Sequence, residues 1–507
     1  MEDASLTSRP DPASAARGDA IDTKPRTRST MDLARFVAET PYDALPQEAI
    51  HATKRLILDE IVVTAATMNT PMAQALLRLK REQGGEPEAT IAVSGEKLPA
   101  QSVAYVHAQL ANLLDADETM LNRMHTVSAS ALAGLALAEK VGATGQECIA
   151  AIALGYDITA RVGLSLAQFV PDGKGGLVFA PIFGWSWMAF GAAATAARLL
   201  KLDALQTARA LGQALVTAPV HFDVLKHQKP FWTDGEPAIW HKYQMCGAAA
   251  EAGINAALLA SYGWVAQTDI LDEGSEFWRS FGAVGCDFKV MYAGLGEHWY
   301  VTDCAIKPYP FCRFGHAALD LLSAMVSDEG LRPEDIEDML VRIPPHDLSR
   351  SLMKLKIVDE GLKLMSSQPT AMALVALGIP PGPKWWDVDL TSEAVRSIAL
   401  KIRSEVNEEW GPILVEQQAG DGYFRRLPTE VIVQTRSGRE HRRYAEYAKG
   451  DPWSPQRMTD EELAGKARTY LADILPEGKV DALVTAVFGL DSASDVGAVA
   501  TAMSIKT

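Results

Sequence analysis

The chain has 507 residues, a formal net charge of −16 and 48% hydrophobic residues, and its pI is near 5.2. This length is enough for two or three domains, each with a buried core. The acidic balance argues against nucleic acid and against an anionic membrane as the main partner, because both require a basic protein surface.

The absence of several short motifs argues against further classes of protein. The five cysteines are scattered and include no C-x-x-C pair, so the sequence indicates neither a disulfide framework nor a structural zinc or iron–sulfur site. A P-loop, a dinucleotide-binding fingerprint and a nucleophile elbow are also absent from the sequence. The cysteine usage favours a reducing, cytoplasmic environment.

The N-terminal part is predicted to be helical after a disordered tail. Residues 1–29 mix acids, bases, Pro and Ser without an apolar run, which is not typical of a signal or transit peptide. Apolar residues then recur at helical spacing, with Ser29 or Thr30 as the first cap. We expect helices within residues 32–67, at 72–83 and at 100–114, with a short strand and turn in ATIAVSGEKLPA.

The stretch LLDADETMLNRMHTVSASALAGLALAE, residues 113–139, carries the first candidate site. Asp115 and Thr119 are four residues apart, so on a helical turn they would share one face, and His125 would open the next helix. A buried histidine beside a carboxylate that holds one tautomer is a candidate general acid or base. The alternative is that His125 only fills a gap between helices.

Residues 175–197 contain no charged side chain, a length that would allow a membrane span. Pro181, Gly184 and Gly191 interrupt the segment, its second half is rich in Ala, and no similar segment accompanies it. We therefore expect a helix buried in a large all-α core.

A long aromatic loop is predicted at residues 218–241. It breaks the helical periodicity and contains Trp232 and Trp240, and such loops are commonly functional. Lys242 then opens a helix of small residues, where the backbone N–H groups favour an anion. Lys242 is therefore a candidate carboxylate clamp, and the preceding His241 a substrate-binding candidate. The alternative for Lys242 is a solvated lysine at a helix start.

After residue 285, β-branched strands alternate with helices, in MLVRIPP, SIALKIRSEV and TEVIVQT. This alternation of strands and helices predicts a second, α+β domain over residues 285–447. Residues 448–507 return to a helical pattern.

Several segments together resemble the 2-methylcitrate dehydratase (MmgE/PrpD) family. They are DADETMLNRMH, GYDITARVG, FGAAATAARLLKLDALQTARALGQA, Lys242 with Gly247 five residues later, IKPYPFCRFGHAALD, and AKGDP with EELAGKA. In the first of them, Asp115, Asp117, Thr119 and His125 match the family pattern by position, and Glu118 stands where the family has a second Asp.

The resemblance implies a mainly α fold in a homodimer. A large helical domain would be formed by residues 30–284 and 448–507, with a smaller α+β lid inserted between them and the active site in the cleft. The family includes 2-methylcitrate dehydratases, cis-aconitate decarboxylase and iminodisuccinate epimerase, which act on small polycarboxylates without a metal. The resemblance therefore implies no metal and no cofactor here.

By the same resemblance, His125 is the acid or base, Asp115 and Thr119 orient it or the substrate, and Lys242 binds a carboxylate. Tyr309 and Arg313, at the start of the lid, would close the pocket as substrate-binding residues. Their alternative is an ordinary turn and helix start.

Two departures from the family bear on the substrate. Where the family has an F-H-P-T-like segment, this chain reads FAPIFGWSWMAFG, with Ala180 or Ile182 in place of the His. The loop before Lys242 is also longer. We infer a substrate other than methylcitrate or cis-aconitate, with fewer carboxylates or a bulkier apolar part.

The sequence thus predicts a metal-independent hydro-lyase that takes a proton next to a carboxylate of a small hydroxycarboxylate. An epimerase or a decarboxylase on the same scaffold is the first alternative, because all three reactions begin at the same kind of carbanion. A non-catalytic carboxylate-binding protein is the second. We expect a cytoplasmic homodimer with neither a nucleic-acid nor a membrane partner.

Overall fold

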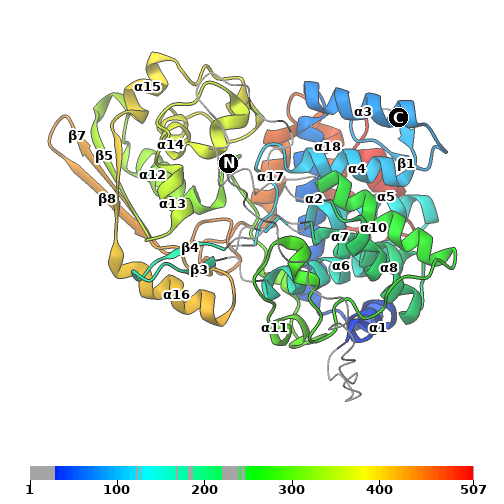
Figure 1. Ribbon diagram of the computed structural model, residues 1–507. Helices are drawn as coiled ribbons and strands as arrows, with labels where there is room; N and C mark the ends of the chain where they lie inside the picture. Colours follow the sequence, from blue (N-terminus) through cyan, green and yellow to red (C-terminus); the bar gives the residue numbers. More distant parts are fainter. Residues whose placement is uncertain are drawn as a thin grey trace, which may run out of the picture.

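The computed structural model describes residues 29–120, 124–125, 127–166, 169–180, 186–219, 238, 240 and 246–505. The fold is mainly α, as the sequence predicts. Figure 1 shows a helical half and a smaller half built on a sheet, side by side. Each half has its own apolar core. The predicted boundaries at residues 284 and 447, and the function of the smaller half as a lid, stay predictions.

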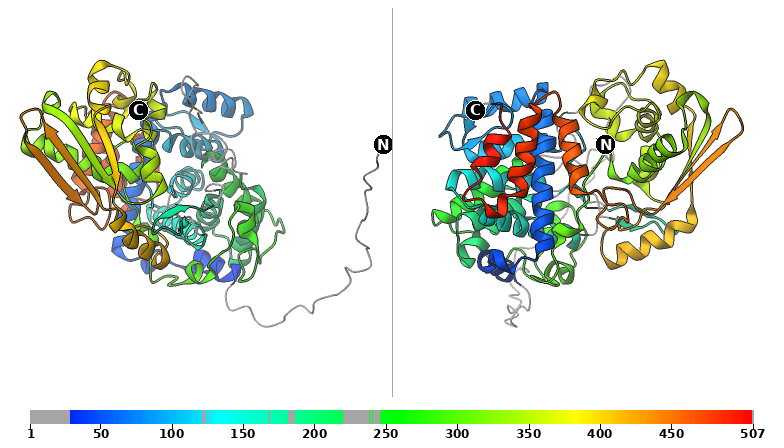
Figure 2. Two further views of the ribbon diagram at one scale, coloured as in Figure 1. Left: turned by 60° about the vertical axis from the view of Figure 1, so that its left-hand side comes forward. Right: turned by 180° about the vertical axis from the view of Figure 1, so that it is seen from behind.

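The helical half takes helices from both ends of the chain. Its α-helices are α1 (Thr30–Glu39), α2 (Gln47–Thr67), α3 (Pro71–Gln83), α4 (Ala100–Ala111), α5 (Val127–Val141), α6 (Gly145–Ser165), α7 (Met188–Leu199), α8 (Ala204–Thr217), α10 (Cys246–Ser261), α11 (Phe288–Tyr292), α17 (Asp460–Leu471), α18 (Glu477–Phe488) and α19 (Gly497–Ala502). From behind, α17 and α18 lie beside the long α2 (Figure 2).

Local sequence signals begin several of these helices. Ser29 is the first residue before α1, as predicted, and forms a capping box with Asp32. The same box occurs before α6, α8 and α17, each time with a side-chain oxygen at the N-cap and Glu or Gln three residues later. Each box satisfies backbone N–H groups that the first turn leaves without helical partners.

Small residues allow the central helices to touch through their backbones. A Cβ atom on Gly155 of α6 would lie 1.9 Å from Thr195 Oγ1 of α7, and one on Gly191 of α7 would lie 1.7 Å from Thr159 Oγ1 of α6. Neither distance is sterically possible, so this crossing requires glycine on both sides.

The sheet half contains four strands in the order β6-β5-β7-β8. β5 (Ile336–Ile343) pairs in parallel with β6 (Ile402–Val406) and antiparallel with β7 (Thr429–Thr435), which pairs antiparallel with β8 (Glu440–Ala445). The accompanying α-helices are α12 (His316–Glu329), α13 (Asp347–Leu352), α14 (Gln368–Ala376), α15 (Glu393–Ala399) and α16 (Gly411–Gly420).

Two short hairpins complete the fold. β1 (Ala89–Thr90) pairs with β2 (Lys97–Leu98), and β3 (Phe169–Pro171) pairs with β4 (Leu177–Phe179). Phe169 and Leu177 are buried in the core of the sheet half, and Leu177 bridges to His346. The prediction of one buried helix across residues 175–197 was therefore wrong in its first part: β4 lies there, and α7 accounts for the α-helix among the described residues of this stretch.

One helix, Gly145–Ser165, is long and apolar enough to cross a membrane by length and composition. All of its apolar window is buried inside the protein. Helix α6 is thus a central core helix, in contact with α5 and α7.

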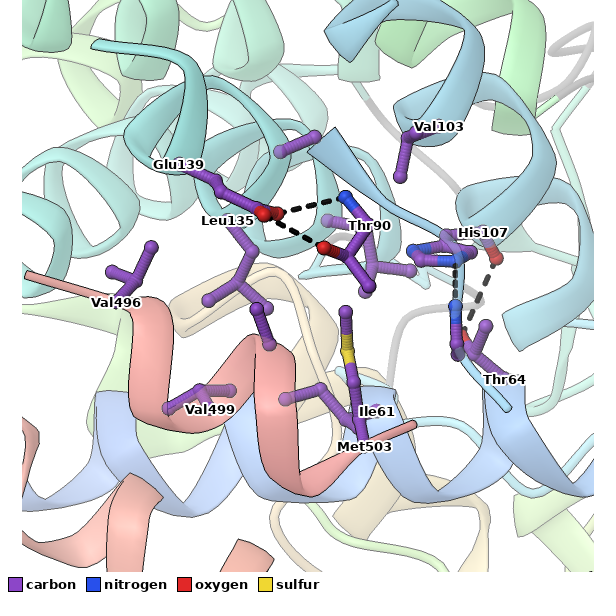
Figure 3. A pocket seen from close by; sticks show the side chains of 14 residues that line it. Ile61, Thr64, Thr90, Val103, His107, Leu135, Glu139, Val496, Val499 and Met503 are labelled. Atoms are coloured by element: carbon purple, nitrogen blue, oxygen red, sulfur yellow. Dashed lines mark hydrogen bonds between the residues drawn. The ribbon is translucent and has the colours of Figure 1, made fainter. Parts of the chain in front are cut away.

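A small cavity of about 20 Å³ lies in the helical half, between α2, α4, α5 and α19 (Figure 3). That volume is about one water molecule. Its polar wall consists of Thr90, bonded to Glu139 at 2.7 Å, and of His107, whose Nε2 accepts a hydrogen bond from the Ala92 amide at 3.0 Å. Loss of hydration lowers the pKa of His107 to about 4, so this imidazole is neutral at physiological pH.

Candidate functional site

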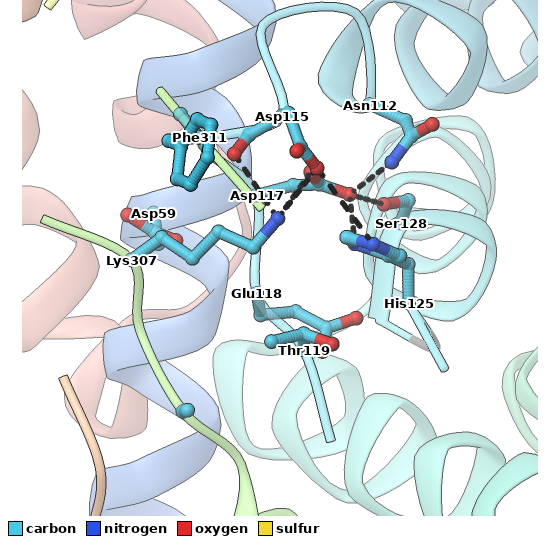
Figure 4. Close-up of polar contacts among 12 residues, drawn as sticks. Asp59, Asn112, Asp115, Asp117, Glu118, Thr119, His125, Ser128, Lys307 and Phe311 are labelled. Atoms are coloured by element: carbon cyan, nitrogen blue, oxygen red, sulfur yellow. Dashed lines mark hydrogen bonds and ion pairs between the residues drawn. The ribbon is translucent and has the colours of Figure 1, made fainter. Parts of the chain in front are cut away.

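The acidic motif forms a loop, not a helical turn. α4 ends at Ala111, and Asp115 has a left-handed φ of +56°. A left-handed φ is uncommon for residues other than Gly, although Asp tolerates it better than most. The predicted helical face shared by Asp115 and Thr119 is therefore wrong. The loop instead aims several buried carboxylates at one point (Figure 4).

Lys307 pairs with this loop from a distant part of the sequence. Its Nζ donates to Asp115 Oδ1 at 2.7 Å and to the Asp115 carbonyl at 3.0 Å, and lies 4.0 Å from Asp117 Oδ1. The Lys307 side chain is only 1% exposed. Burial alone lowers the pKa of Lys307, but Asp115 and Asp117 outweigh it and raise the pKa above its usual value. Lys307 is thus a fixed cation in a dry site.

His125 contacts the same two carboxylates. Its Nδ1 lies 3.0 Å from Asp117 Oδ2, and its Nε2 lies 3.9 Å from Asp115 Oδ1. Asp117 Oδ2 also accepts from Asn112 Nδ2 at 2.8 Å and from the Ser128 hydroxyl at 3.4 Å. The Asp117 carboxylate thus lies close enough to the imidazole to stabilise a positive charge on it.

Glu118 fixes the helix that follows His125. It accepts a hydrogen bond from the backbone N–H of Val127, the first residue of α5. A carboxylate is favourable at a helix N-terminus. The Cys304 thiol, whose pKa burial raises well above its usual value, donates to the other Glu118 oxygen at 3.1 Å. Glu118 therefore ties the start of α5 to the segment that carries Lys307.

Thr119 forms hydrogen bonds with backbone groups. Its hydroxyl donates to the Met124 carbonyl at 2.7 Å, and its amide and carbonyl form a two-bond bridge with Ala305, each bond 3.0 Å long. The Met120 amide also donates to the Met124 carbonyl, at 2.9 Å. Thr119 thus binds Met124, the residue before His125; a contact of its side chain with a substrate stays a prediction.

A second layer of buried charge lies beneath the motif. Lys466 of α17 donates to Asp59 of α2 at 2.5 Å and to the Ala116 carbonyl at 2.8 Å. Burial raises the pKa of Asp59, while Lys466 acts to lower it. Glu60 is the next residue. Burial raises its pKa well above the usual value, and the negative charges of Asp117 and Glu118 add to this effect. Helices from both chain ends thus support the loop.

Tyr309 and Arg313 lie at the base of the sheet half and bond to other protein groups. The Tyr309 hydroxyl donates to Asp320 Oδ1 at 3.0 Å, and Arg313 forms a buried ion pair with Asp451. Both side chains are under 10% exposed. Their predicted role in binding substrate stays a prediction.

The second predicted cluster, Lys242 and His241, lies outside the described residues, as do Trp232 and Ile182. Of the same stretches, Ala180 is buried and Trp240 is half exposed. The structure therefore brings together Asp115 and His125 among the predicted catalytic residues, and it joins Thr119 to Met124, next to His125.

Sequence reasoning missed Lys307 as a site residue. It stands in CAIKPYPF, an apolar stretch, and a lone lysine among residues predicted to be buried is a signal for a paired cation. Asp117 was noted as part of the motif, but its bond to His125 could not be predicted.

The donor set can be tested against a metal ion. Asp115, Asp117 and His125 each offer one ligand atom, and these atoms lie within 4.8 Å of one another. The Lys307 ammonium already neutralises Asp115, so a cation would have to displace it. The residues present therefore fit an ammonium-balanced carboxylate site better than a metal site, and metal-independence stays a prediction.

The fold and the site define a class: a mainly helical protein in which an α+β half delivers a buried lysine to a histidine–carboxylate cluster. Such a cluster can move a proton on a carbon next to a carboxylate. The chain belongs to the MmgE/PrpD family: residues 31–284 match its N-terminal domain and residues 309–490 its C-terminal domain. Members of the family are mostly enzymes, namely dehydratases and decarboxylases. No curated protein matches the chain.

Proposed function

We propose that the protein is a hydro-lyase that removes water from a small hydroxycarboxylate. The observation that carries the proposal is the buried contact of His125 Nδ1 with Asp117, beside the Lys307–Asp115 pair. A base beside a carboxylate and a fixed cation are the two groups that a carbon-acid reaction requires.

In the proposed reaction, His125 Nε2 takes the proton from the carbon next to a carboxylate. Negative charge then develops on that carboxylate, and Lys307 stabilises it, together with Lys242 if that residue acts as predicted. The C–O bond of the β-hydroxyl breaks, and the leaving oxygen takes the proton from the His125 imidazolium. Water and an unsaturated carboxylate result, and the histidine returns to its neutral form.

Asp117 has a positioning role in this scheme. The negative charge of Asp117 stabilises the imidazolium that forms when His125 takes the proton. Since Asn112 and Ser128 also donate to Asp117, the carboxylate keeps its orientation through the reaction.

We further propose a substrate with fewer carboxylates than methylcitrate, on the basis of the buried Ala180 near the position where the family has a histidine. Metal-independence, the homodimer and the cytoplasmic location belong to the same proposal, as does the lack of a nucleic-acid or membrane partner.

Proton NMR in D₂O tests the reaction. Purified protein is incubated with hydroxy-, imino- and enoic di- and tricarboxylates, with and without EDTA, beside His125→Gln. His51→Gln is the matched control, because His51 is about half exposed on α2 and pairs with Asp460 at the surface.

We expect loss of water with deuterium incorporation in the wild type and in His51→Gln, and none in His125→Gln. Epimerisation or CO₂ release in place of dehydration would replace the hydro-lyase by one of its alternatives. Binding without any exchange would identify a carboxylate-binding protein.

A further inference from the structure

Two segments that run between the halves of the protein contact each other beside the acidic motif. We define the first connection as residues 304–309 and the second connection as residues 447–451. They touch through backbone atoms: the Ile306 amide donates to the Gly450 carbonyl at 3.1 Å. A Cβ atom on Gly450 would lie 1.9 Å from the Ile306 carbonyl oxygen, so glycine is required for this approach.

Every second residue of the first connection contacts the acidic motif. Ala305 bridges to Thr119, and Lys307 binds Asp115, while Ile306 between them contacts the second connection. This alternation is that of an extended chain. The position of Lys307 is therefore tied to that of both connections.

Asp320 of α12 holds the two connections at a fixed spacing. Its Oδ1 accepts from the Tyr309 hydroxyl of the first connection at 3.0 Å, and its Oδ2 accepts from the Lys449 amide of the second at 2.8 Å. Close by, the second connection is also bound to Arg313, through an ion pair with Asp451, which accepts from the Ala448 amide at 2.9 Å.

We propose that Asp320, acting through Tyr309, is a positioning residue that sets where Lys307 stands against the Asp115–His125 cluster. This inference rests on the proposed function. It also gives Tyr309 a different role from the one predicted, because its hydroxyl acts on Asp320 and not on a substrate. Tyr309 is two residues from Lys307 in an extended segment, so a shift at Tyr309 is transmitted to the ammonium. A displacement of about 1 Å in a site of this kind can lower the rate about 100-fold.

The test compares Tyr309→Phe and Asp320→Ala with two controls. Tyr444→Phe makes the same change at a half-exposed tyrosine of β8, and Asp328→Ala makes it at an exposed aspartate of the same helix α12. Asp320→Ala removes both carboxylate oxygens, so the contacts with the Tyr309 hydroxyl and with the Lys449 amide are both lost.

Amide hydrogen exchange is the first readout, and it requires no turnover. We expect faster exchange in residues 303–309 and 115–120 of both variants, at least 10-fold at Ala305 and Thr119, with α6 and both controls unchanged. Unchanged exchange at these amides would overturn the proposal. A uniform acceleration throughout both halves would also overturn it, since it would indicate a purely structural role.

Kinetics of the double variant is the second readout. Each single variant should lower kcat/KM about 10- to 100-fold, and Tyr309→Phe with Asp320→Ala should lose no more than Asp320→Ala alone, because Asp320→Ala has already removed the contact that Tyr309→Phe removes. Multiplicative losses would show that Tyr309 acts on the substrate independently and would refute the assignment. If no substrate turns over, the proposed function fails while the exchange experiment still decides the positioning role.

Discussion

Lys307→Met removes the buried cation of the site while keeping the length of the side chain. At 2.7 Å from Asp115, an effective dielectric constant of about 20 gives an attraction of about 6 kcal/mol. Desolvation of both charges offsets part of it, and removing one partner of a buried pair costs about 3–5 kcal/mol. For a chain of this size, with an unfolding entropy of about 1 kcal/mol/K, Tm should fall by about 3–5 °C.

Stability and activity should separate in the double variant Lys307→Met with Asp115→Asn. Asn tolerates the left-handed φ of +56° at this position, and the uncompensated carboxylate is gone. We therefore expect most of the lost Tm to return, while kcat/KM stays about 100- to 1,000-fold below the wild type.

Differential scanning calorimetry and the D₂O assay measure the two effects. Lys384→Met is the control, because Lys384 forms an exposed pair with Asp473, and its Tm should not change. A Tm of Lys307→Met equal to that of the control would refute the buried-pair reasoning. A return of activity in the double variant would refute the role of Lys307 in the reaction.

Three further predictions concern other residues. His125→Gln should lower turnover about 100- to 10,000-fold with Tm within a few degrees, as measured by NMR and calorimetry; a collapse of folding would indicate a structural histidine. Lys242→Ala should raise KM and lower kcat together in steady-state kinetics, and an unchanged kcat/KM would remove this lysine from the site. His107→Gln should make the protein less sensitive to acid. Because the folded pKa of His107, about 4, lies below its ordinary value, the unfolded chain binds more protons, and stability falls as pH falls below about 6.5. Between pH 7 and 4.5 the wild type should lose about 2 kcal/mol more than the variant in urea titrations.

The helical half could be predicted well because its signals are local. Apolar spacing indicated helices where α2, α3 and α4 lie. The first helix cap at Ser29 was also predicted. These features depend on residues within one or two turns of each other, so no knowledge of the tertiary structure was required.

The segment at residues 169–179 shows where local reasoning fails. Its second half, residues 175–179, carries no charge, which is equally consistent with a buried helix and with a buried strand. Tertiary contacts favour the hairpin: Phe169 and Leu177 pack in the core of the sheet half, and Leu177 forms a bridge to His346.

The residue types and spacing of Asp115, Thr119 and His125 were enough to predict a site in this stretch. The contacts within the site depend on the folded chain. Lys307 stands 192 residues after Asp115, and Lys466 stands 407 residues after Asp59, so no local pattern could pair them. A buried charge is unfavourable unless an opposite charge lies beside it. Because this pairing exists only in the folded chain, the acidic motif forms a strained loop around Lys307 and not the helical turn that was expected.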